Sequence, residues 1–261
     1  MLFTIYYYSN TGNSLHAAKK LAEKLPECRL VSMTSNSQKP VADTEGIGFV
    51  FPTHYFGAPP VVLEFIKKLK LQQAKYVFAV ASCGFRHINS SLNQVDKVLK
   101  EKNSKLDAGF HLEMVSSYIP LSDIPPADKT EKRLADADKK IADIANTISS
   151  KEKKVSAEFL RLLSRVINKY WLKNLLSKAP KKFSVSQACT SCGICKKVCP
   201  TDNIFMESGK PKWGKDCQEC LACLHFCPDK CIEFGKKTIG RKRYHHPKVS
   251  VGEIIASRNK L

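Results

Sequence analysis

Two stretches near the C-terminus decide the fold of that part of the chain: CTSCGICKKVCP at residues 189–200 and CQECLACLHFCP at residues 217–228. Every cysteine of the second stretch lies 28 positions after its counterpart in the first, and so does the proline. Both stretches follow the pattern C-x2-C-x2-C-x3-C-P. The chain therefore contains a short metal-binding unit in two copies.

The cysteine spacing predicts iron–sulfur clusters. Three cysteines spaced in this way can wrap one loop around three corners of a cubane, and the cysteine before proline ligates the other cluster in a two-cluster unit. We therefore predict two [4Fe–4S] clusters, one bound by Cys189, Cys192, Cys195 and Cys227, and the other by Cys217, Cys220, Cys223 and Cys199. The alternative is structural zinc, which takes its four ligands as two separated pairs and has no use for the third cysteine.

The remaining cysteines are not part of the repeat. Cys231 stands where the first copy has Asn203, and we interpret it as a buried small residue, while Cys28 is expected to be inert. The N-terminus has neither the basic region nor the cleavage site of a signal peptide. Clustered cysteines in such a chain indicate metal binding rather than disulfides. We expect a cytoplasmic protein.

The first 150 residues alternate between strand-like and helix-like patterns. Strands are predicted at 2–8, 29–33, 46–51, 76–81 and within 106–119, and helices at 14–25, 60–69, 88–99 and 128–148. Continuous apolar runs such as 46–51 are typical of buried parallel strands. The pattern predicts a doubly wound α/β domain with a five-stranded parallel sheet, and periodicity alone leaves the strand order open.

Three loops follow predicted strands at the carboxyl edge of this sheet, where open α/β folds bind ligands. The first can offer N–H groups and hydroxyls to a phosphate, although a simple helix cap would also explain it. The others would supply an aromatic platform and backbone amides. The candidate binding residues are Ser9, Asn10, Thr11, Gly12, Asn13 and Ser14, then Pro52, Thr53, Tyr55, Phe56 and Gly57, and finally Ser82, Cys83, Gly84 and Phe85.

Two family resemblances follow from these motifs. Ser9, Thr11, Gly12 and Ser14 meet the phosphate-loop pattern of flavodoxins, which the first domain therefore resembles. That resemblance implies strand order 2-1-3-4-5 and bound FMN. It also implies that Tyr55 or Phe56 stacks on the isoalloxazine and that residues 82–85 flank its pyrimidine edge; a buried-core role is the alternative for the two aromatics.

Residues 186–235 resemble bacterial-type two-cluster ferredoxins. This resemblance implies two short hairpins and two small helices around the clusters, with pseudo-twofold symmetry, and low-potential one-electron transfer. The combined order resembles short flavodoxin–ferredoxin fusion proteins of anaerobic microbes. We expect four segments: a flavodoxin-like domain at 1–150, a connector at 151–185, the ferredoxin domain at 186–235 and a tail at 236–261.

Positive charge is concentrated outside the two domains. Of the formal net charge of +19, +8 lies in residues 151–186 and +7 in residues 236–261. Residues 153–178 are predicted to form a basic amphipathic helix. Such a helix can lie on a membrane surface, but we favour packing of its apolar stripe against the neighbouring domain. The tail has little core-forming pattern outside 249–255.

These features favour an electron carrier that passes electrons between FMN and two [4Fe–4S] clusters and on to redox partner proteins, acidic ones among them. The alternative is a flavin-dependent reductase of a quinone or nitro compound, for which only His54 and His87 stand out as general acids. We assign no catalytic residue. Nucleic acid is disfavoured, because Tyr244 alone could stack among the basic residues of the tail. The sequence predicts no oligomeric state.

Overall fold

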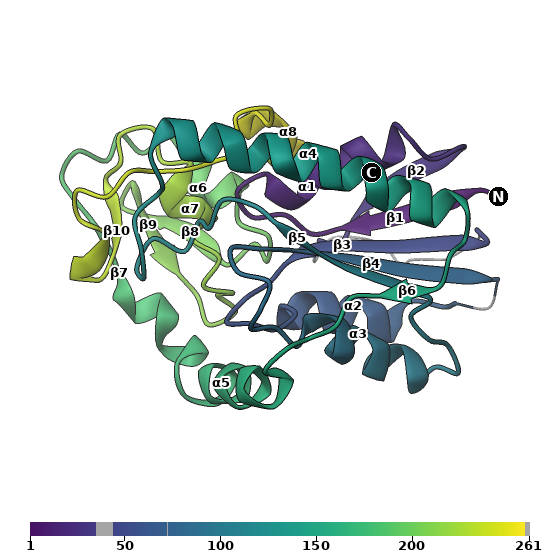
Figure 1. Cartoon of the computed structure of the whole chain (residues 1–261). Coiled ribbons are helices and arrows are strands. Elements are labelled where there is room, and N and C mark those ends of the chain that lie inside the picture. The colour runs from purple at the N-terminus through teal and green to yellow at the C-terminus, as the bar shows by residue number, and fades with distance from the viewer. Residues whose placement is uncertain (35–43, 72, 259–261) are drawn as a thin grey trace.

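A parallel sheet forms the centre of the first domain in the computed structural model, which describes residues 1–34, 44–71 and 73–258 (Figure 1). Its strand order is β2-β1-β3-β4-β5-β6. The strands are β1 (Phe3–Tyr7), β2 (Cys28–Ser32), β3 (Gly46–Pro52), β4 (Tyr76–Cys83), β5 (Ala108–Glu113) and β6 (Lys154–Val155). The expected order 2-1-3-4-5 is confirmed.

The sixth strand was not expected. β6 adds to the edge of the sheet by pairing in parallel with β5, with Ala108 opposite Lys154 and Gly109 opposite Val155. Residues 154–155 had been predicted as the start of the connector helix. The edge of β5 offers unpaired backbone groups to the returning chain, and pairing with them outweighs the weak helical preference of two residues.

Helices cover both faces of the sheet (Figure 1). One face carries α1 (Asn13–Ala22) and α4 (Ala127–Ser149), and the other carries α2 (Pro60–Lys68) and α3 (Ser91–Lys100). Successive residues of a strand point to opposite faces. Accordingly, Ile5 belongs to the core beneath α1 and α4, whereas Tyr6 belongs to the core beneath α2 and α3.

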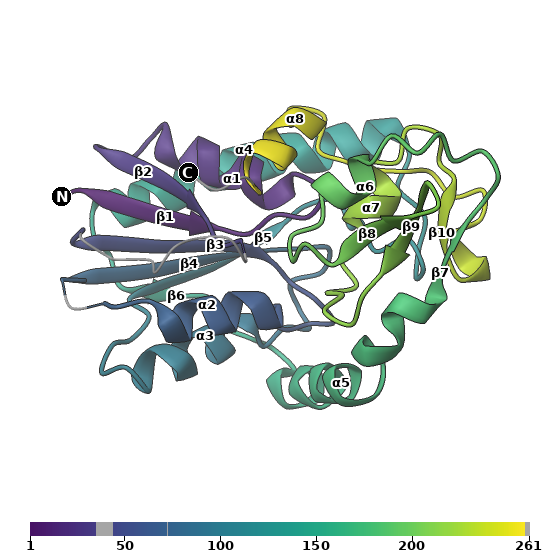
Figure 2. The same ribbon diagram turned by 180° about the vertical axis from the view of Figure 1, so that it is seen from behind.

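The cysteine-rich unit is built from two short antiparallel pairs. β7 (Phe183–Val185) pairs with β10 (Ile232–Phe234), and β8 (Ile204–Glu207) pairs with β9 (Lys210–Trp213). Two one-turn helices, α6 (Ile194–Lys197) and α7 (Ala222–His225), lie side by side above β8 and β9 in Figure 2. The unit lies beyond the carboxyl ends of the sheet strands, and Val198, Ala222 and Phe226 join the core beneath α1.

The connector helix contradicts our expectation. α5 (Arg161–Asn174), followed by the 3-10 helix η1 (Leu176–Lys182), exposes its apolar stripe: Leu162 is 72% exposed and Val166 66%. The buried face contains Ser164, Asn168 and Trp171, of which only Trp171 belongs to the predicted apolar stripe. The physical reason is that the neighbouring loop presents backbone carbonyls, and Asn168 satisfies them. No described helix is long and apolar enough to cross a bilayer.

The tail returns to the first domain and packs there. α8 (Val251–Ala256) begins with a capping box formed by Ser250 and Glu253, and it lies beside α1 in Figures 1 and 2. Lys19 forms an ion pair with Glu253 at 2.6 Å. Val249 and Ile254 are buried in the same core as α1. The apolar residues within 249–255 thus anchor the tail, as their pattern suggested.

Candidate functional site

A cavity of about 750 Å³ lies between the carboxyl edge of the sheet and the cysteine-rich unit. Thirteen of the fifteen predicted binding residues line it, and only Gly12 and Gly57 do not. The wall also includes residues that no sequence motif indicated, among them Val115, Ser116, Ser117 and Tyr118 after β5, Ile167 and Trp171 of α5, and Glu219 and Cys220 of the cysteine-rich unit.

The two glycines shape the packing behind the wall. Gly12 has a φ of +97°, and a Cβ there would lie 3.0 Å from the Cβ atoms of His246 and Val249. A Cβ on Gly57 would lie 2.5 Å from the amide nitrogen of Asn168. Both positions therefore require glycine, for a left-handed backbone at the first and for close approach at both.

The first loop presents unsatisfied polar groups to the cavity. α1 has Gly12 as its N-cap with no side-chain cap, so its first N–H groups remain available, and the helix-cap alternative does not hold. Ser9 Oγ and Asn10 Oδ1 are buried and have no hydrogen-bond partner within the described residues. Buried polar atoms are normally paired. An anionic group at the positive end of α1 would supply the missing partner, so the loop fits a phosphate.

Two further residues of the first loop, Ser14 and Thr11, carry hydroxyls. Ser14 Oγ lies 2.8 Å from Ser82 Oγ, which joins the first loop to the third. Thr11 is buried, and its carbonyl accepts a hydrogen bond from the backbone N–H of His246 at 2.8 Å. The tail thus supports the loop from behind, a contribution that no motif in the sequence indicated.

The second loop is a strained turn. His54 and Gly57 exchange two backbone hydrogen bonds of 2.8 and 3.0 Å around Tyr55 and Phe56. Those two residues have φ values of 44° and 63°. Residues other than glycine and asparagine adopt such backbone conformations only at an energetic cost. Both aromatics line the cavity and are half-buried, so a core role is not what the structure has. Strain of this kind concentrates at ligand sites.

Trp171 of α5 supports the turn from the other side. Its indole stacks on the ring of Tyr55, with centroids 4.8 Å apart and planes at 11°. Asn168 donates hydrogen bonds to the carbonyls of His54 and Tyr55 at 3.0 and 3.3 Å. Gln94 of α3 donates to the Asn168 oxygen at 2.9 Å. The connector therefore holds the aromatic turn in place.

A buried carboxylate connects this wall to the cysteine-rich unit. Glu219 lies between Cys217 and Cys220 and is 3% exposed. It accepts hydrogen bonds from the hydroxyls of Tyr118 at 2.6 Å and Tyr55 at 3.0 Å, and from the indole N–H of Trp171 at 2.9 Å. Burial and the nearby carboxylate raise the pKa of Tyr118 far above its ordinary value. No sequence signal identified Glu219, since its partners come from three distant segments.

The candidate general acids of the reductase alternative differ in position. His54 is buried, and burial lowers its pKa to about 4, so it is neutral at pH 7. Its Nε2 lies 2.7 Å from the amide nitrogen of Asn10. His87 is exposed and does not line the cavity. Cys83 does line it, but burial raises the pKa of its thiol to about 12, so it is protonated at neutral pH.

The predicted ligands of the first cluster surround one small cavity. Cys189, Cys192, Cys195 and Cys227 all line it. Cys231 lines it as well; it is buried as expected, and its Sγ lies 3.3 Å from that of Cys227. The structure therefore brings the cysteine before the second proline to the loop of the first run.

The predicted ligands of the second cluster also lie together. Burial first, and then the neighbouring Cys199 thiol, raise the pKa of Cys220 to about 12. Backbone N–H groups point at Cys199 Sγ from Asn203 and at Cys217 Sγ from Glu219, at 3.3 and 3.4 Å. The indole N–H of Trp213 points at Cys223 Sγ at 3.5 Å. These donors suit thiolates bound to a cluster.

Both sets of four cysteines fit an iron–sulfur cluster better than a single metal ion. Within residues 1–34, 44–71 and 73–258, no three His, Cys, Asp or Glu side chains are placed to hold one metal ion. A four-iron cluster takes one thiolate at each iron, so its ligands stand apart around a shared space. The first set has its four thiols around a common cavity, and the second set has N–H donors aimed at three of its sulfurs, both of which suit such a cluster.

One cation lies behind the cavity wall. Arg258 is 4% exposed and donates a hydrogen bond to the carbonyl of Ser9. The thiols of Cys220 and Cys199 are among the groups that act on it electrostatically, while burial lowers its pKa. The tail thus brings a positive charge to the junction of the phosphate loop and the second thiol group.

Comparison with known proteins agrees with these two halves. A flavodoxin domain model matches residues 4–112, and a 4Fe-4S binding domain model matches residues 186–205. A ferredoxin-like protein of the vnf region of Azotobacter chroococcum is 44% identical over 52 residues, which are 17% of this chain and 80% of that protein.

Two solved structures are similar to part of this chain. One is rubredoxin oxygen:oxidoreductase of Desulfovibrio gigas, with a TM-score of 0.34 and 18% identity, covering 57% of this chain and 36% of that larger protein. The other is a flavodoxin of Streptococcus pneumoniae TIGR4, with a TM-score of 0.34 and 15% identity, covering 55% of this chain and 99% of that one. The chain is a redox electron-transfer protein that joins an N-terminal flavodoxin domain to a C-terminal ferredoxin domain, and by this second domain it belongs to the ferredoxin-like family.

Proposed function

We propose that the chain passes electrons between one FMN in the large cavity and two [4Fe–4S] clusters, and from there to redox partner proteins. The flavodoxin domain would hold the FMN phosphate at the Ser9–Ser14 loop. Each cluster would be held by three cysteines of one run and the last cysteine of the other run. One cluster would be bound by Cys189, Cys192, Cys195 and Cys227, and the other by Cys217, Cys220, Cys223 and Cys199. We place this activity in the cytoplasm.

One observation carries the proposal: Cys220 lines the same cavity as the phosphate loop and the aromatic turn. A proposed ligand of the second cluster and the walls of the proposed flavin site thus line one cavity. Electron tunnelling weakens steeply with distance, so carriers that share a cavity wall exchange electrons quickly. The first cluster would lie at a separate cavity, where Cys192 is exposed, and would serve external partners.

The chain's own residues would orient and shield the cofactors. A bound flavin accepts one or two electrons and each cluster accepts one, so the set can split a pair of electrons into single steps. Tyr55 and Phe56 form the aromatic side of the flavin site, and Ser82 and Gly84 its third loop. The indole N–H of Trp213 and the backbone N–H of Glu219 donate to the sulfurs of Cys223 and Cys217, where they would stabilise negative charge on the second cluster.

The decisive experiment is anaerobic purification followed by quantification of iron and flavin and an ultraviolet–visible spectrum. About eight iron atoms and one FMN per chain are expected if both cysteine runs carry four-iron clusters. Stopped-flow reduction should then show flavin and cluster bands changing in a coupled sequence. About four iron atoms, or FAD in place of FMN, would contradict the corresponding part of the proposal.

A second candidate is supported by the extent of the cavity. Beyond the predicted flavin residues its wall continues to Leu121, Phe234 and three lysines, Lys182, Lys236 and Lys237. This region could admit an anionic aromatic substrate, which the bound flavin would reduce with electrons from the ferredoxin domain. Steady-state assays with quinones and nitro compounds would separate an enzyme from a carrier. Turnover that saturates with a small molecule would favour the enzyme.

A further inference from the structure

Helix α5 exposes two parallel rows of side chains to solvent. Arg161, Arg165, Lys169 and Lys173 follow one another at intervals of four residues and form a basic row. Leu162, Val166 and Tyr170 form an apolar row directly beside it, each more than half exposed. Seven of the thirteen large exposed hydrophobic side chains of the described residues lie between positions 159 and 172.

The basic row has no ion-pair partner among residues 1–34, 44–71 and 73–258. None of the ion pairs among the described residues includes Arg161, Arg165, Lys169 or Lys173. Residues 159–186 contain seven Lys or Arg and no Asp or Glu. The surface is therefore positively charged and apolar at once, a combination that water alone does not favour.

The inward face of α5 keeps these rows pointing outward. Asn168 is tied to the turn at His54 and to Gln94, and Trp171 is tied to Tyr55 and Glu219. Rotating the helix to bury Leu162 or Val166 would break these hydrogen bonds and leave buried polar groups unpaired. The exposure of the apolar row is thus built into the fold rather than an effect of loose packing.

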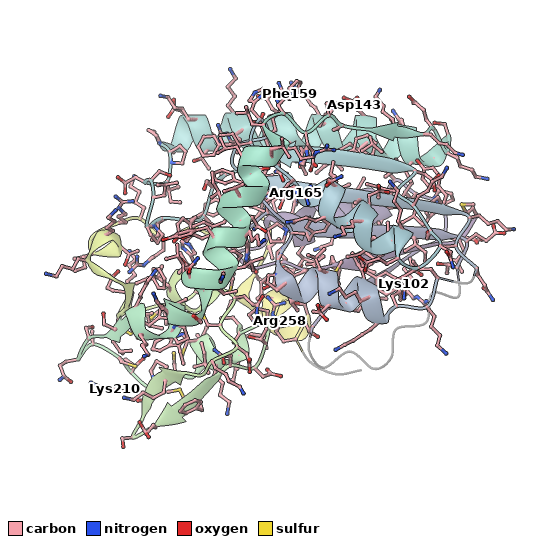
Figure 3. The ribbon with its side chains drawn as sticks, turned by 90° about the horizontal axis from the view of Figure 1, so that it is seen from below. Lys102, Asp143, Phe159, Arg165, Lys210 and Arg258 are labelled. Atoms are coloured by element: carbon pink, nitrogen blue, oxygen red, sulfur yellow. The ribbon has the colours of Figure 1, made fainter. Side chains whose placement is uncertain are left out.

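The shape of this surface selects its partner. Figures 1 and 2 show α5 at one edge of the molecule, and Figure 3, which labels Phe159 and Arg165, shows it lying across the near side when seen from below. A single helix with aromatic residues at Phe159 and Tyr170 matches a lipid headgroup region, where aromatic rings and basic side chains are favoured. A protein partner would require a groove of matching shape, whereas a bilayer adapts to a ridge.

We propose that residues 159–173 dock the protein on an anionic lipid surface, with Leu162, Val166 and Tyr170 inserted at the interface and the basic row on the headgroups. The proposal does not depend on which cofactors are bound. It commits to a peripheral contact, since α5 is an amphipathic helix of 14 residues lying along the surface of the protein.

The test is co-flotation of the holoprotein with vesicles of phosphatidylcholine containing about 30% phosphatidylglycerol, compared with pure phosphatidylcholine. We expect binding to the anionic vesicles that weakens strongly at about 0.5 M salt. The double variants Leu162→Asn/Val166→Asn and Arg165→Gln/Lys169→Gln should each lower the partition coefficient at least about tenfold. All four side chains are exposed, so neither variant should change cofactor content.

Matched control variants are Lys139→Gln/Lys140→Gln on α4, which remove two exposed cations, and Ile239→Asn, which removes an exposed apolar side chain. Both should bind vesicles as the wild type does. Wild-type protein that does not float with anionic vesicles would overturn the proposal. So would binding that survives both α5 variants, or a dimer in solution that Leu162→Asn/Val166→Asn dissociates, because α5 would then be a contact between copies of the chain.

Discussion

The phenol of Tyr55 donates a hydrogen bond of 3.0 Å to the carboxylate of Glu219, across the boundary between the flavodoxin domain and the ferredoxin domain. Tyr55 belongs to the turn that walls the flavin site, and Glu219 lies between two predicted cluster ligands. The proposed flavin site and the proposed second cluster site therefore share a hydrogen-bonded contact. Tyr118 and Trp171 donate to the same carboxylate and widen this contact.

The first prediction concerns that contact. Glu219→Ala would remove the shared acceptor of Tyr55, Tyr118 and Trp171, and it would leave the buried indole N–H of Trp171 unpaired at a cost of about 1–3 kcal/mol. We expect a lower urea midpoint and slower electron transfer from flavin to cluster in stopped-flow reduction. Glu219→Gln keeps an acceptor oxygen and should lie between this variant and the wild type. An Ala variant with unchanged midpoint and rate would show that the contact is dispensable.

The second prediction tests the crossed ligation. Cys199→Ala should impair the cluster held by Cys217, Cys220 and Cys223, and Cys227→Ala should impair the cluster held by the first run. Electron paramagnetic resonance of each reduced variant distinguishes the two clusters. Cys231 lies next to Cys227, so Cys227→Ala should also be made together with Cys231→Ala to remove a substitute thiol. The assignment would be refuted if each variant lost the cluster built on the run that contains the substituted cysteine and kept the other cluster.

The third prediction concerns the phosphate loop. Ser9 Oγ is buried without a partner, so Ser9→Ala removes no hydrogen bond within the described residues. The change should leave the urea midpoint of flavin-free protein unchanged or raised. It should weaken FMN binding by about 0.5–3 kcal/mol, because a hydroxyl donor to a charged phosphate is lost.

Thr11→Ala should weaken FMN binding in the same direction, with iron content unaltered. Ser149→Ala, at the exposed end of α4, is the matched control. Equal FMN dissociation constants for Ser9→Ala and the control would remove this loop from the flavin site.

The fourth prediction concerns the potential of the second cluster. The indole N–H of Trp213 points at Cys223 Sγ, and such donors stabilise the more negative, reduced cluster. Trp213→Phe removes the donor but keeps the ring that stacks on Phe183 at 4.5 Å. The potential of this cluster should fall by about 60 mV for each 1.4 kcal/mol lost. Redox titration followed by electron paramagnetic resonance measures it, and the first cluster serves as the internal reference.

The fifth prediction concerns pH. Burial lowers the pKa of His54 to about 4, and it lowers that of His225 to about 4 and that of His246 to about 3. Below about pH 6.5 these histidines bind protons in the unfolded chain, whereas in the folded chain they stay neutral until the pH is much lower. The folding stability that is present above about pH 6.5 is therefore lost as the pH falls.

Each buried histidine adds a slope of up to about 1.4 kcal/mol per pH unit below pH 6.5. Urea midpoints between pH 7.5 and 5.5 should fall accordingly, and His54→Gln should flatten the dependence. The same slope in the variant and in the wild type would show that His54 protonates without cost to the fold.

The sequence by itself determined the chemistry of this protein. The cysteine repeat, the order of strands and helices, and the three loops after β1, β3 and β4 are local patterns, and local patterns specify residue types at fixed spacing. Thirteen of the fifteen residues chosen from those loops line one cavity, because the carboxyl ends of parallel strands meet at one edge of the sheet.

Only the tertiary structure decided which face of a helix packs against the rest of the chain and which distant residues meet. Periodicity showed that α5 has an apolar stripe, but its docked side is the one whose polar groups meet the carbonyls at His54 and Tyr55. In the sequence, Glu219 is a charged residue between two cysteines. The fold brings Tyr55, Tyr118 and Trp171 to it from three other segments. Such contacts join residues more than 40 positions apart, and no pattern within a short window can report them, since their energies depend on what the fold brings together.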